Sequence, residues 1–181
     1  MSKILVDTID TRSGTSNITI GSSNASQITL KSGATLTNFP ANTPAFLAYP
    51  SGGSSGGSIS NLTETTVPLN TEVFDTSSKF DTSTYRFTPG IAGKYFIYAS
   101  GRVQSDADFD PFQVSIYKND SSELARSQDR HEHYTIGFTS VVADLNTTDY
   151  ITLKMYQGSG GTLQISGFQN VTFMGGYKIV E

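Results

Sequence analysis

A pair of histidines offers the strongest candidate for chemistry in this sequence. His131 and His133 are separated by one residue, so in an extended strand both imidazoles would lie on one face. Imidazole nitrogens are common ligands of transition metals. The alternative is an ordinary polar loop ahead of a strand at 133–145, and it accounts for the same residues. We therefore predict no metal site here and keep the pair as a candidate.

Three aspartates form a second candidate. Asp106, Asp108 and Asp110 have the spacing of the first three ligands of a calcium-binding loop. That loop also needs Gly at its sixth position and Glu at its twelfth, where this chain has Pro111 and Tyr117. The residues do not form an EF-hand, and a solvated acidic turn explains them.

Catalysis has little support in the sequence. It contains no Gly-x-Ser-x-Gly elbow, no phosphate-binding Walker loop and no His-Glu-x-x-His motif. Glu64, Glu72, Asp75 and Asp81 lie near the ends of expected strands, but no spacing joins two of them into an acid–base pair. We predict a protein that is not an enzyme and needs no cofactor.

Composition limits the fold class and the functional classes that fit the sequence. Only 15% of the residues are charged and 36% are hydrophobic, and Ser, Thr and Gly fill the difference. Thr, Tyr and Phe favour strands, whereas Ser and Gly favour turns, so the composition predicts an all-β fold. The net charge is −4 and basic residues do not cluster, which argues against nucleic-acid binding. The sequence contains no Cys, which excludes disulfides and thiolate sites.

No segment is apolar enough to predict membrane insertion or export. A transmembrane helix needs about 18 or more apolar residues, and a secretory signal needs an apolar stretch of about 7–15. The opening MSKILVDTIDT has only three consecutive apolar residues before Asp7. We therefore expect a protein that is made in the cytoplasm of its host cell without a signal peptide.

Residues 40–181 are expected to form the folded head. A Gly/Ser-rich loop at 51–58 follows a short strand at 46–49. Further strands are expected at regular spacing with turn residues between them, which suggests a β-sandwich or barrel. They are predicted near 65–75, 84–88, 93–104, 111–118, 133–145, 149–157, 161–167 and 170–180.

Residues 1–39 differ from the head and predict an extended β-structured arm. The arm has no aromatic residue before Phe39, and two couplets repeat within it, Asn17–Gly21 and Gln27–Lys31. Its aliphatic residues are too few to form a core of their own, so the arm is expected to dock on a partner or to wind with its own copies. The expected anchoring residues are Ile4, Val6, Ile18, Ile20, Ile28 and Leu30.

The head resembles the globular head of the complement q subcomponent, which is related to tumour necrosis factor. The most specific likeness is Thr84–Phe96, with an aromatic residue, a Phe-Thr-Pro-Gly turn and an aromatic strand. Val73-Phe74-Asp75, Val114–Asn119 and Phe173–Tyr177 are similar to neighbouring strands of that family. The chain has Thr148-Asp149 where the family usually has Gly-Asp.

This resemblance implies a tumour necrosis factor-like jelly roll that associates as a homotrimer. The residues agree, because the strand from Tyr95 to Ala99 is apolar on both faces and must be covered on both. One cover would be the core and the other a neighbouring subunit. The expected core residues are Phe87, Tyr95, Ile97 and Phe173. In such a trimer, three His131–His133 pairs near the axis would supply an octahedral metal site, and calcium at the trimer apex stays open for the aspartates.

The opening MSKILVDTIDTRSGTSNITIG is similar to the N-termini of structural proteins of marine tailed bacteriophages. The resemblance implies a virion structural protein: a trimeric fibre or knob, or a capsid or tail decoration, held by its arm on other virion proteins. The alternative is a receptor- or carbohydrate-binding module for adsorption to the host. In that case exposed rings, with Phe109 and Tyr134 as candidates, would stack on a host-surface glycan.

Overall fold

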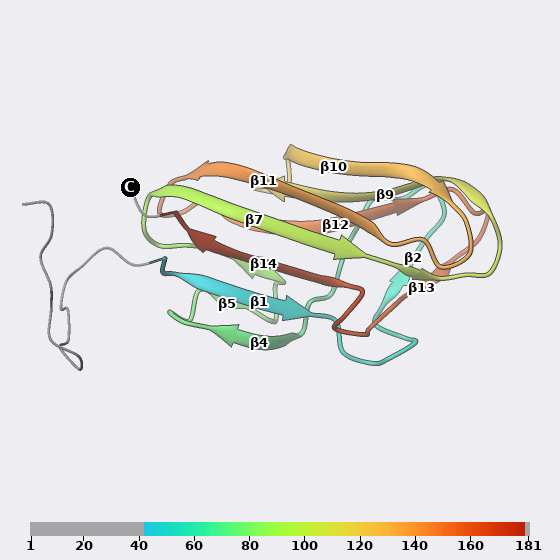
Figure 1. Ribbon diagram of the computed structural model, residues 1–181, viewed down its shortest axis with the longest axis horizontal. Helices are drawn as coiled ribbons and strands as arrows, with labels where there is room; N and C mark the ends of the chain where they lie inside the picture. The colour runs from blue at the N-terminus through green and yellow to red at the C-terminus, as the bar shows by residue number, and fades with distance from the viewer. Residues whose placement is uncertain (1–41, 180–181) are drawn as a thin grey trace, which may run out of the picture. The chain divides into compact units, whose positions relative to one another are not determined.

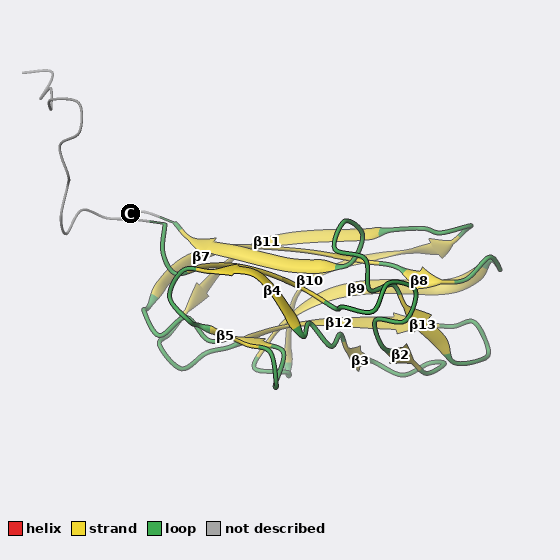
Figure 2. Cartoon of the chain, turned by 90° about the horizontal axis from the view of Figure 1, so that it is seen from below, coloured by secondary structure: helices red, strands yellow, loops and turns green. Residues whose placement is uncertain are grey.

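The computed structural model describes residues 42–179, and these residues fold into β-strands and loops without a helix (Figures 1 and 2). The anchoring arm predicted at 1–39, including its Ile, Val and Leu couplets, lies outside the described residues. The strands are β1 (Ala45–Tyr49), β2 (Ser58–Ile59), β3 (Thr65–Thr66), β4 (Thr71–Asp75), β5 (Phe80–Asp81), β6 (Arg86–Phe87), β7 (Gly93–Gly101), β8 (Val103–Gln104), β9 (Phe109–Lys118), β10 (Ser122–His131), β11 (Gly137–Leu145), β12 (Ile151–Gln157), β13 (Leu163–Ile165) and β14 (Phe173–Lys178).

The strands form two large antiparallel sheets and one small one. The five-stranded sheet has the order β11-β7-β14-β1-β4. The six-stranded sheet has the order β10-β9-β12-β6-β5, with β3 paired to β12. Figure 2 shows β7 and β11 in one layer and β12 and β5 in the other. The small sheet, β2-β13-β8, lies at the end of the molecule towards which β7 points (Figure 1).

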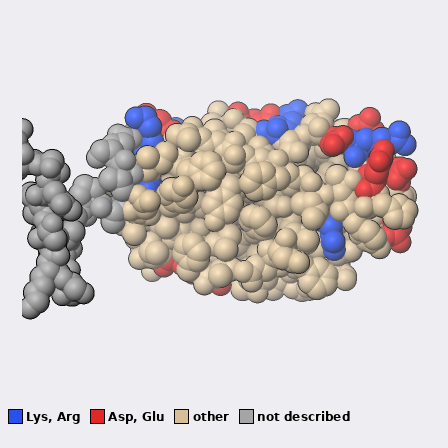
Figure 3. All heavy atoms as spheres, in the orientation of Figure 1, with Lys and Arg blue, Asp and Glu red and all other residues tan. Residues whose placement is uncertain are grey.

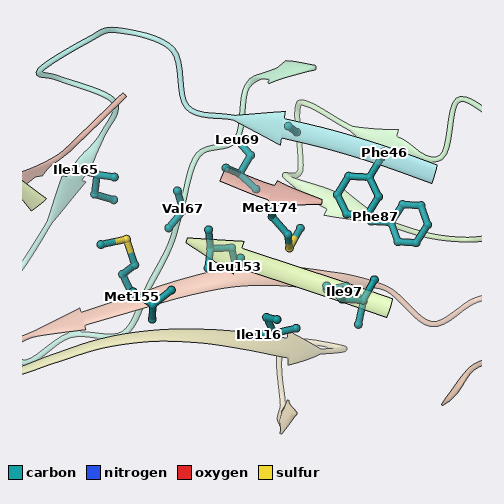
Figure 4. Packing of buried hydrophobic residues seen from close by; sticks show 14 of the residues in the cluster. Phe46, Val67, Leu69, Phe87, Ile97, Ile116, Leu153, Met155, Ile165 and Met174 are labelled. Atoms are coloured by element: carbon teal, nitrogen blue, oxygen red, sulfur yellow. The ribbon is translucent and has the colours of Figure 1, made fainter. Parts of the chain in front are cut away.

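Alternation along each strand explains why the two large sheets face each other. On β12, Ile151, Leu153 and Met155 are buried in the core, while Lys154 points to the opposite face of the sheet. The same period of two brings Val114 and its alternate neighbours on β9 into the core. Figure 4 shows side chains from both sheets meeting in the space between them. The core is therefore a β-sandwich core.

Stacked aromatic rings occupy the end of this core near β1 and β6. Phe46 stacks on Phe87 with ring centroids 4.2 Å apart and on Phe80 at 5.3 Å. Tyr95 meets Phe87 edge-on at 5.9 Å, and its hydroxyl donates to the carbonyl of Ile91 at 2.7 Å. The one polar atom of this ring cluster is thus bonded, so burial of the tyrosine costs no unpaired hydroxyl.

Three of the four expected core residues lie in the core and the fourth does not. Phe87, Tyr95 and Ile97 are fully buried. Phe173 is only partly buried on the outer face of the five-stranded sheet, because the register of β14 turns its neighbour Met174 inward, opposite Ala99. The residue of β14 that points into the core is therefore Met174 and not Phe173. A shift of one residue along a strand moves a side chain to the opposite face of the sheet.

The strand pattern also differs from the expected one in several places. Ser122–His131 forms β10, a ten-residue edge strand that the sequence does not predict. The strand expected from residue 133 begins only at Gly137, after a loop in which His133 and Tyr134 have positive φ angles. β2 and β5 are also absent from the expected strands. The strand expected at 65–75 is divided into β3 and β4, and the strand expected at 93–104 into β7 and β8. The all-β class agrees with expectation.

The two ends of the described chain lie together. Ala45 at the start of β1 pairs with Tyr177 near the end of β14, and the amide of Lys178 donates to the carbonyl of Pro44 at 3.1 Å. We call the opposite end of the head, with the small sheet and the loops at 104–109 and 131–136, the distal end (Figure 1). No helix within residues 42–179 is long and apolar enough to cross a membrane.

Candidate functional site

The outer face of the five-stranded sheet carries aromatic and aliphatic side chains. Tyr95 and Ile97 of β7 point into the core, so Phe96 and Tyr98 point outward. We call this surface the aromatic face. Its members are Leu47, Phe74, Phe96, Tyr98, Phe138, Val142, Phe173 and Tyr177.

Ring contacts give the aromatic face a fixed arrangement. The Phe96 ring lies 5.7 Å from that of Tyr177 and 5.9 Å from that of Tyr98, and Tyr98 meets Phe173 edge-on at 6.2 Å. Tyr98 lies across Gly175, where an added Cβ would come within 2.5 Å of the tyrosine oxygen. Burial, followed by the neighbouring Tyr177, raises the pKa of Tyr98 above its ordinary value. The rings are therefore already partly ordered within one protomer.

The edge of this face is the most exposed part. Phe138 and Val142 on β11, the edge strand, are each 55% exposed, and Phe74 on the opposite edge is 44% exposed. Lys94 and Asp144 pair across β7 and β11 at one end of the face. Figure 3 shows this side of the molecule almost free of Lys, Arg, Asp and Glu. A contiguous exposed apolar surface of this kind marks an interaction site.

The outer face of the six-stranded sheet has the opposite character. Lys154 lies 3.2 Å from the Glu64 carboxylate, and Tyr117 donates a hydrogen bond to the same carboxylate. The Lys154 ammonium also lies 4.3 Å from the centroid of the Tyr117 ring. Burial and the bond to Glu64 raise the pKa of Tyr117 to about 12. These polar groups bond one another, so this face has less need of a partner.

Carboxylates elsewhere in the head are engaged in turns and ion pairs. Asp120 accepts hydrogen bonds from Arg86 at 2.6 Å, Thr152 at 2.9 Å and Tyr150 at 3.1 Å. Its burial alone would raise its pKa, but the bonds from Thr152, Arg86 and Tyr150 outweigh burial and lower it. Each of these bonds stabilises the ionised carboxylate rather than preparing it for proton transfer.

The four carboxylates considered for catalysis are not brought together as an acid–base pair. The Asp75 carboxylate accepts hydrogen bonds from the backbone amides of residues 79 and 80, and these bonds shape the β4–β5 turn. Asp81 accepts bonds from Ser83 and Thr84, which lower its pKa to about 2. Glu64 is bonded to Tyr117 and Lys154, and Glu72 is an exposed residue of β4. The described geometry gives them structural roles.

The histidine candidates are placed differently from each other. His131 is fully buried at the end of β10, stacked on Phe109 at 4.4 Å, with its Nδ1 3.2 Å from the carbonyl oxygen of Ala107. His133 is exposed in the loop beyond the strand, so the two imidazoles do not share one strand face. Burial lowers the pKa of His131.

The three aspartate candidates also have different surroundings. Asp106 raises the pKa of the nearby Tyr134 above its ordinary value, and Asp108 lies 3.9 Å from Arg130. Asp110 is exposed within β9. Among residues 42–179, no group of three or more His, Asp or Glu side chains is arranged to hold a metal ion.

A small hollow lies at the distal end. It has a volume of about 210 Å³ and is lined by Gln104, Ser105, Asp106 and Tyr134. Tyr134 is 47% exposed, whereas Phe109, the other ring considered for stacking on a glycan, is buried beneath His131. Gln104 was not predicted as a site residue, although Ser105 and Asp106 follow it directly; Tyr134 reaches the hollow from a distant segment of the chain.

Comparison with known proteins identifies the fold. No protein-family model matches the chain, and no curated protein matches it. Among solved structures, murine APRIL at pH 5.0 is similar with a TM-score of 0.59 and 16% identity over 75% of this chain and 98% of that one. The globular domain of zebrafish complement 1qA protein has a TM-score of 0.55 and 16% identity over 76% of this chain and 98% of that one.

Eiger TNF from S. frugiperda gives a TM-score of 0.54 and 11% identity over 76% of this chain and 92% of that one. Each of these three structures matches this chain over nearly all of its own length. With the antiparallel sheets described above, they confirm the all-β class and the jelly-roll prediction. The head of this chain has a tumour necrosis factor-like jelly-roll fold.

Proposed function

We propose that the head associates with copies of itself into a homotrimer through the aromatic face, and that it works as a non-enzymatic structural and binding head. The observation that carries the proposal is the ring-covered outer face of the five-stranded sheet, which has few charged residues. Burying such a surface releases about 25 cal/mol for each Å² of apolar area removed from water.

The layout of the face supports a closed ring of subunits. Phe138 and Val142 project from an edge strand, whereas Phe173 and Tyr177 lie on β14 in the middle of the sheet. The edge of one subunit can therefore pack on the middle of the next. This is a head-to-tail contact, and such contacts form a ring when the rotation between subunits closes. A ring of three is the arrangement implied by the family resemblance, and the jelly-roll fold of the head agrees with it.

A virion role is the finer part of the proposal. Its support is the opening sequence, which is similar to N-termini of phage structural proteins, and the low content of charged residues. The described chain begins and ends at one end of the head, which leaves the distal end free to project from a surface. In this proposal residues 1–39 attach the trimer to other virion proteins of the capsid, neck or tail.

The trimer is tested by mass. Light scattering of the full chain should give about three times 19.5 kDa. Val142→Asp places a charge on an exposed position of the aromatic face, so it should lower the mass to that of a monomer without unfolding the head. Gln128→Asp, on the exposed strand β10 of the other sheet, is the matched control and should remain trimeric. A wild-type monomer at micromolar concentration would refute the proposal.

The virion role is tested by reconstitution. Particles that lack the protein are mixed with the full chain or with a chain lacking residues 1–39. The full chain should be incorporated, and the truncated chain should stay in solution as a folded trimer. Equal incorporation of both would transfer the attachment to the head and overturn the assignment of the arm.

A second function, receptor or glycan binding, is favoured by one observation. The exposed Tyr134 ring borders a polar hollow at the distal end, on the side of the head that the proposed arrangement leaves free. The structural and the binding roles are compatible in one protein.

A further inference from the structure

The small sheet at the distal end displays a row of uncharged hydrogen-bonding side chains. Gln104 and Gln164 face each other across β8 and β13. The Gln164 amide donates to the Ser58 hydroxyl at 3.1 Å and accepts from the Ser55 hydroxyl at 2.9 Å. Each primary amide has two donor hydrogens and two acceptor lone pairs. These bonds therefore orient the exposed Gln164 amide and leave it one donor and one acceptor for a ligand.

Gln104 is held in the same way at the border of the 210 Å³ hollow. Its amide nitrogen donates to the Ser166 hydroxyl at 3.2 Å. Ser166 is buried and also accepts from the Arg102 guanidinium at 3.3 Å, so both side chains are anchored on one hydroxyl. The hollow thus has a wall whose amide is positioned before any ligand arrives, which reduces the entropy lost on binding.

An aromatic ring forms another wall of the hollow. The guanidinium carbon of Arg102 lies 5.4 Å from the centroid of the Tyr134 ring, and the Asp106 carboxylate lines the same hollow. The contact with Arg102 orients the ring, which nevertheless remains 47% exposed. The backbone of Tyr134 has a φ of +60°, a conformation that a bulky residue rarely adopts. Such strain in an exposed loop is often found at binding sites.

We infer that this hollow, formed by Gln104, Ser105, Asp106 and Tyr134, binds one ring of a neutral saccharide. A sugar ring presents C–H groups on its face and hydroxyls around its edge. The Tyr134 ring suits the face, while the Gln104 amide, the Ser105 hydroxyl and the Asp106 carboxylate suit the edge. The volume is below the roughly 300–1,000 Å³ of pockets for larger ligands, which fits a single ring or a chain end.

Charge and polarity argue for this class over others. The Asp106 carboxylate on the wall repels phosphates and acidic sugars. The Gln104 amide and the Ser105 hydroxyl are also polar, so an apolar ligand would leave them without partners. The inference extends the binding role proposed above and uses the trimer only for avidity, because three copies raise the strength of attachment to a surface without strengthening any single site.

The test measures single-site binding in solution on the full-length protein. Saturation-transfer NMR is recorded with glucose, galactose, mannose and N-acetylglucosamine, and with glucuronic acid as the acidic comparison. At least one neutral sugar should receive saturation. Tyr134→Ala and Gln104→Ala should each weaken its affinity by about tenfold or more, which corresponds to the loss of one good contact. Tyr156→Ala, on the far sheet, is the control and should bind as the wild type does.

The outcomes separate this site from the trimer proposal, since light scattering is run on every sample. A trimer that binds none of the neutral sugars, or binds only glucuronic acid, overturns the site and leaves the trimer intact. A monomer that binds a neutral sugar, with loss of binding in Tyr134→Ala, supports the site and refutes the trimer. Equal binding by Tyr134→Ala and wild type overturns the site.

Discussion

Two adjacent residues of β14 distinguish the stability of the fold from the stability of the assembly. Met174 is fully buried and has Ala48 and Ala99 as its cross-strand neighbours. Truncating a buried Met costs about 2–5 kcal/mol of unfolding free energy. Because the neighbouring alanines are too small to fill the space, Met174→Ala should fall in the upper half of this range.

Phe173 lies on the aromatic face, where its known contact is the edge-on pair with Tyr98 at 6.2 Å. An aromatic pair contributes about 0.5–1.5 kcal/mol, so Phe173→Ala should cost a single protomer about that much. In the proposed trimer the residue also contacts a partner. Loss of that contact should appear as a cost that depends on protein concentration, since subunit binding stabilises the folded state by mass action.

Urea unfolding of the full chain at two concentrations, for example 0.5 and 50 μM, measures both effects. Met174→Ala should lower the unfolding midpoint by a similar amount at both concentrations. Phe173→Ala should shift it most at the low concentration, with a matching loss of trimer in light scattering. If Phe173→Ala costs as much as Met174→Ala at every concentration, then Phe173 points into the core and the register of β14 is wrong.

Three further outcomes are expected. Burial holds the pKa of His131 below the ordinary 6.5, so the unfolded chain takes up the proton first and stability falls as pH drops below about 6.5. Urea midpoints from pH 7.5 to 5 should show the fall. His131→Phe should reduce it strongly, and His133→Gln, which removes a smaller cause of the lowered pKa, should reduce it less. Gly175→Ala should displace Tyr98 and weaken the trimer in light scattering while the far-ultraviolet spectrum stays that of wild type. The pKa of Tyr117 is raised to about 12, so stability that is present below pH 10 should be lost between pH 10 and 12. Tyr117→Phe should lose less stability over this range. A titration in which the variant and the wild type behave alike would contradict the environment assigned to Tyr117.

The sequence predicts the class of the fold and most strands because alternation survives wherever one face is buried. Phe112, Val114 and Ile116 are spaced two apart in the strand expected at 111–118, and they lie together in the core. β10 escapes prediction because its residues are mostly polar and exposed on both faces at the edge of a sheet. An edge strand without an apolar side carries no period of two to detect.

The position of Phe173 could not be predicted for a related reason. Phe173 and Met174 are adjacent apolar residues, and the Gly175-Gly176 pair that follows has no side chain to show which face is inward. Only the pairing of β14 with β7 decides between them.

The two candidate sites also differ in how far the sequence predicts them. A strand apolar on both faces predicts the aromatic face from residues adjacent in the sequence. Three residues that line the distal hollow are consecutive, Gln104, Ser105 and Asp106. Tyr134 joins them from the loop before β11, so no local motif predicts the hollow.

The pairing of the first and last described strands has a mechanical consequence. β1 lies between β14 and β4, and it runs from the end where the described chain begins towards the distal end. A force that pulls residue 42 away from a load held at the distal end acts along the axis of β1. Its hydrogen bonds to both neighbours are then sheared together instead of being broken one after another. A head tethered at that end would resist drag with all of these bonds at once.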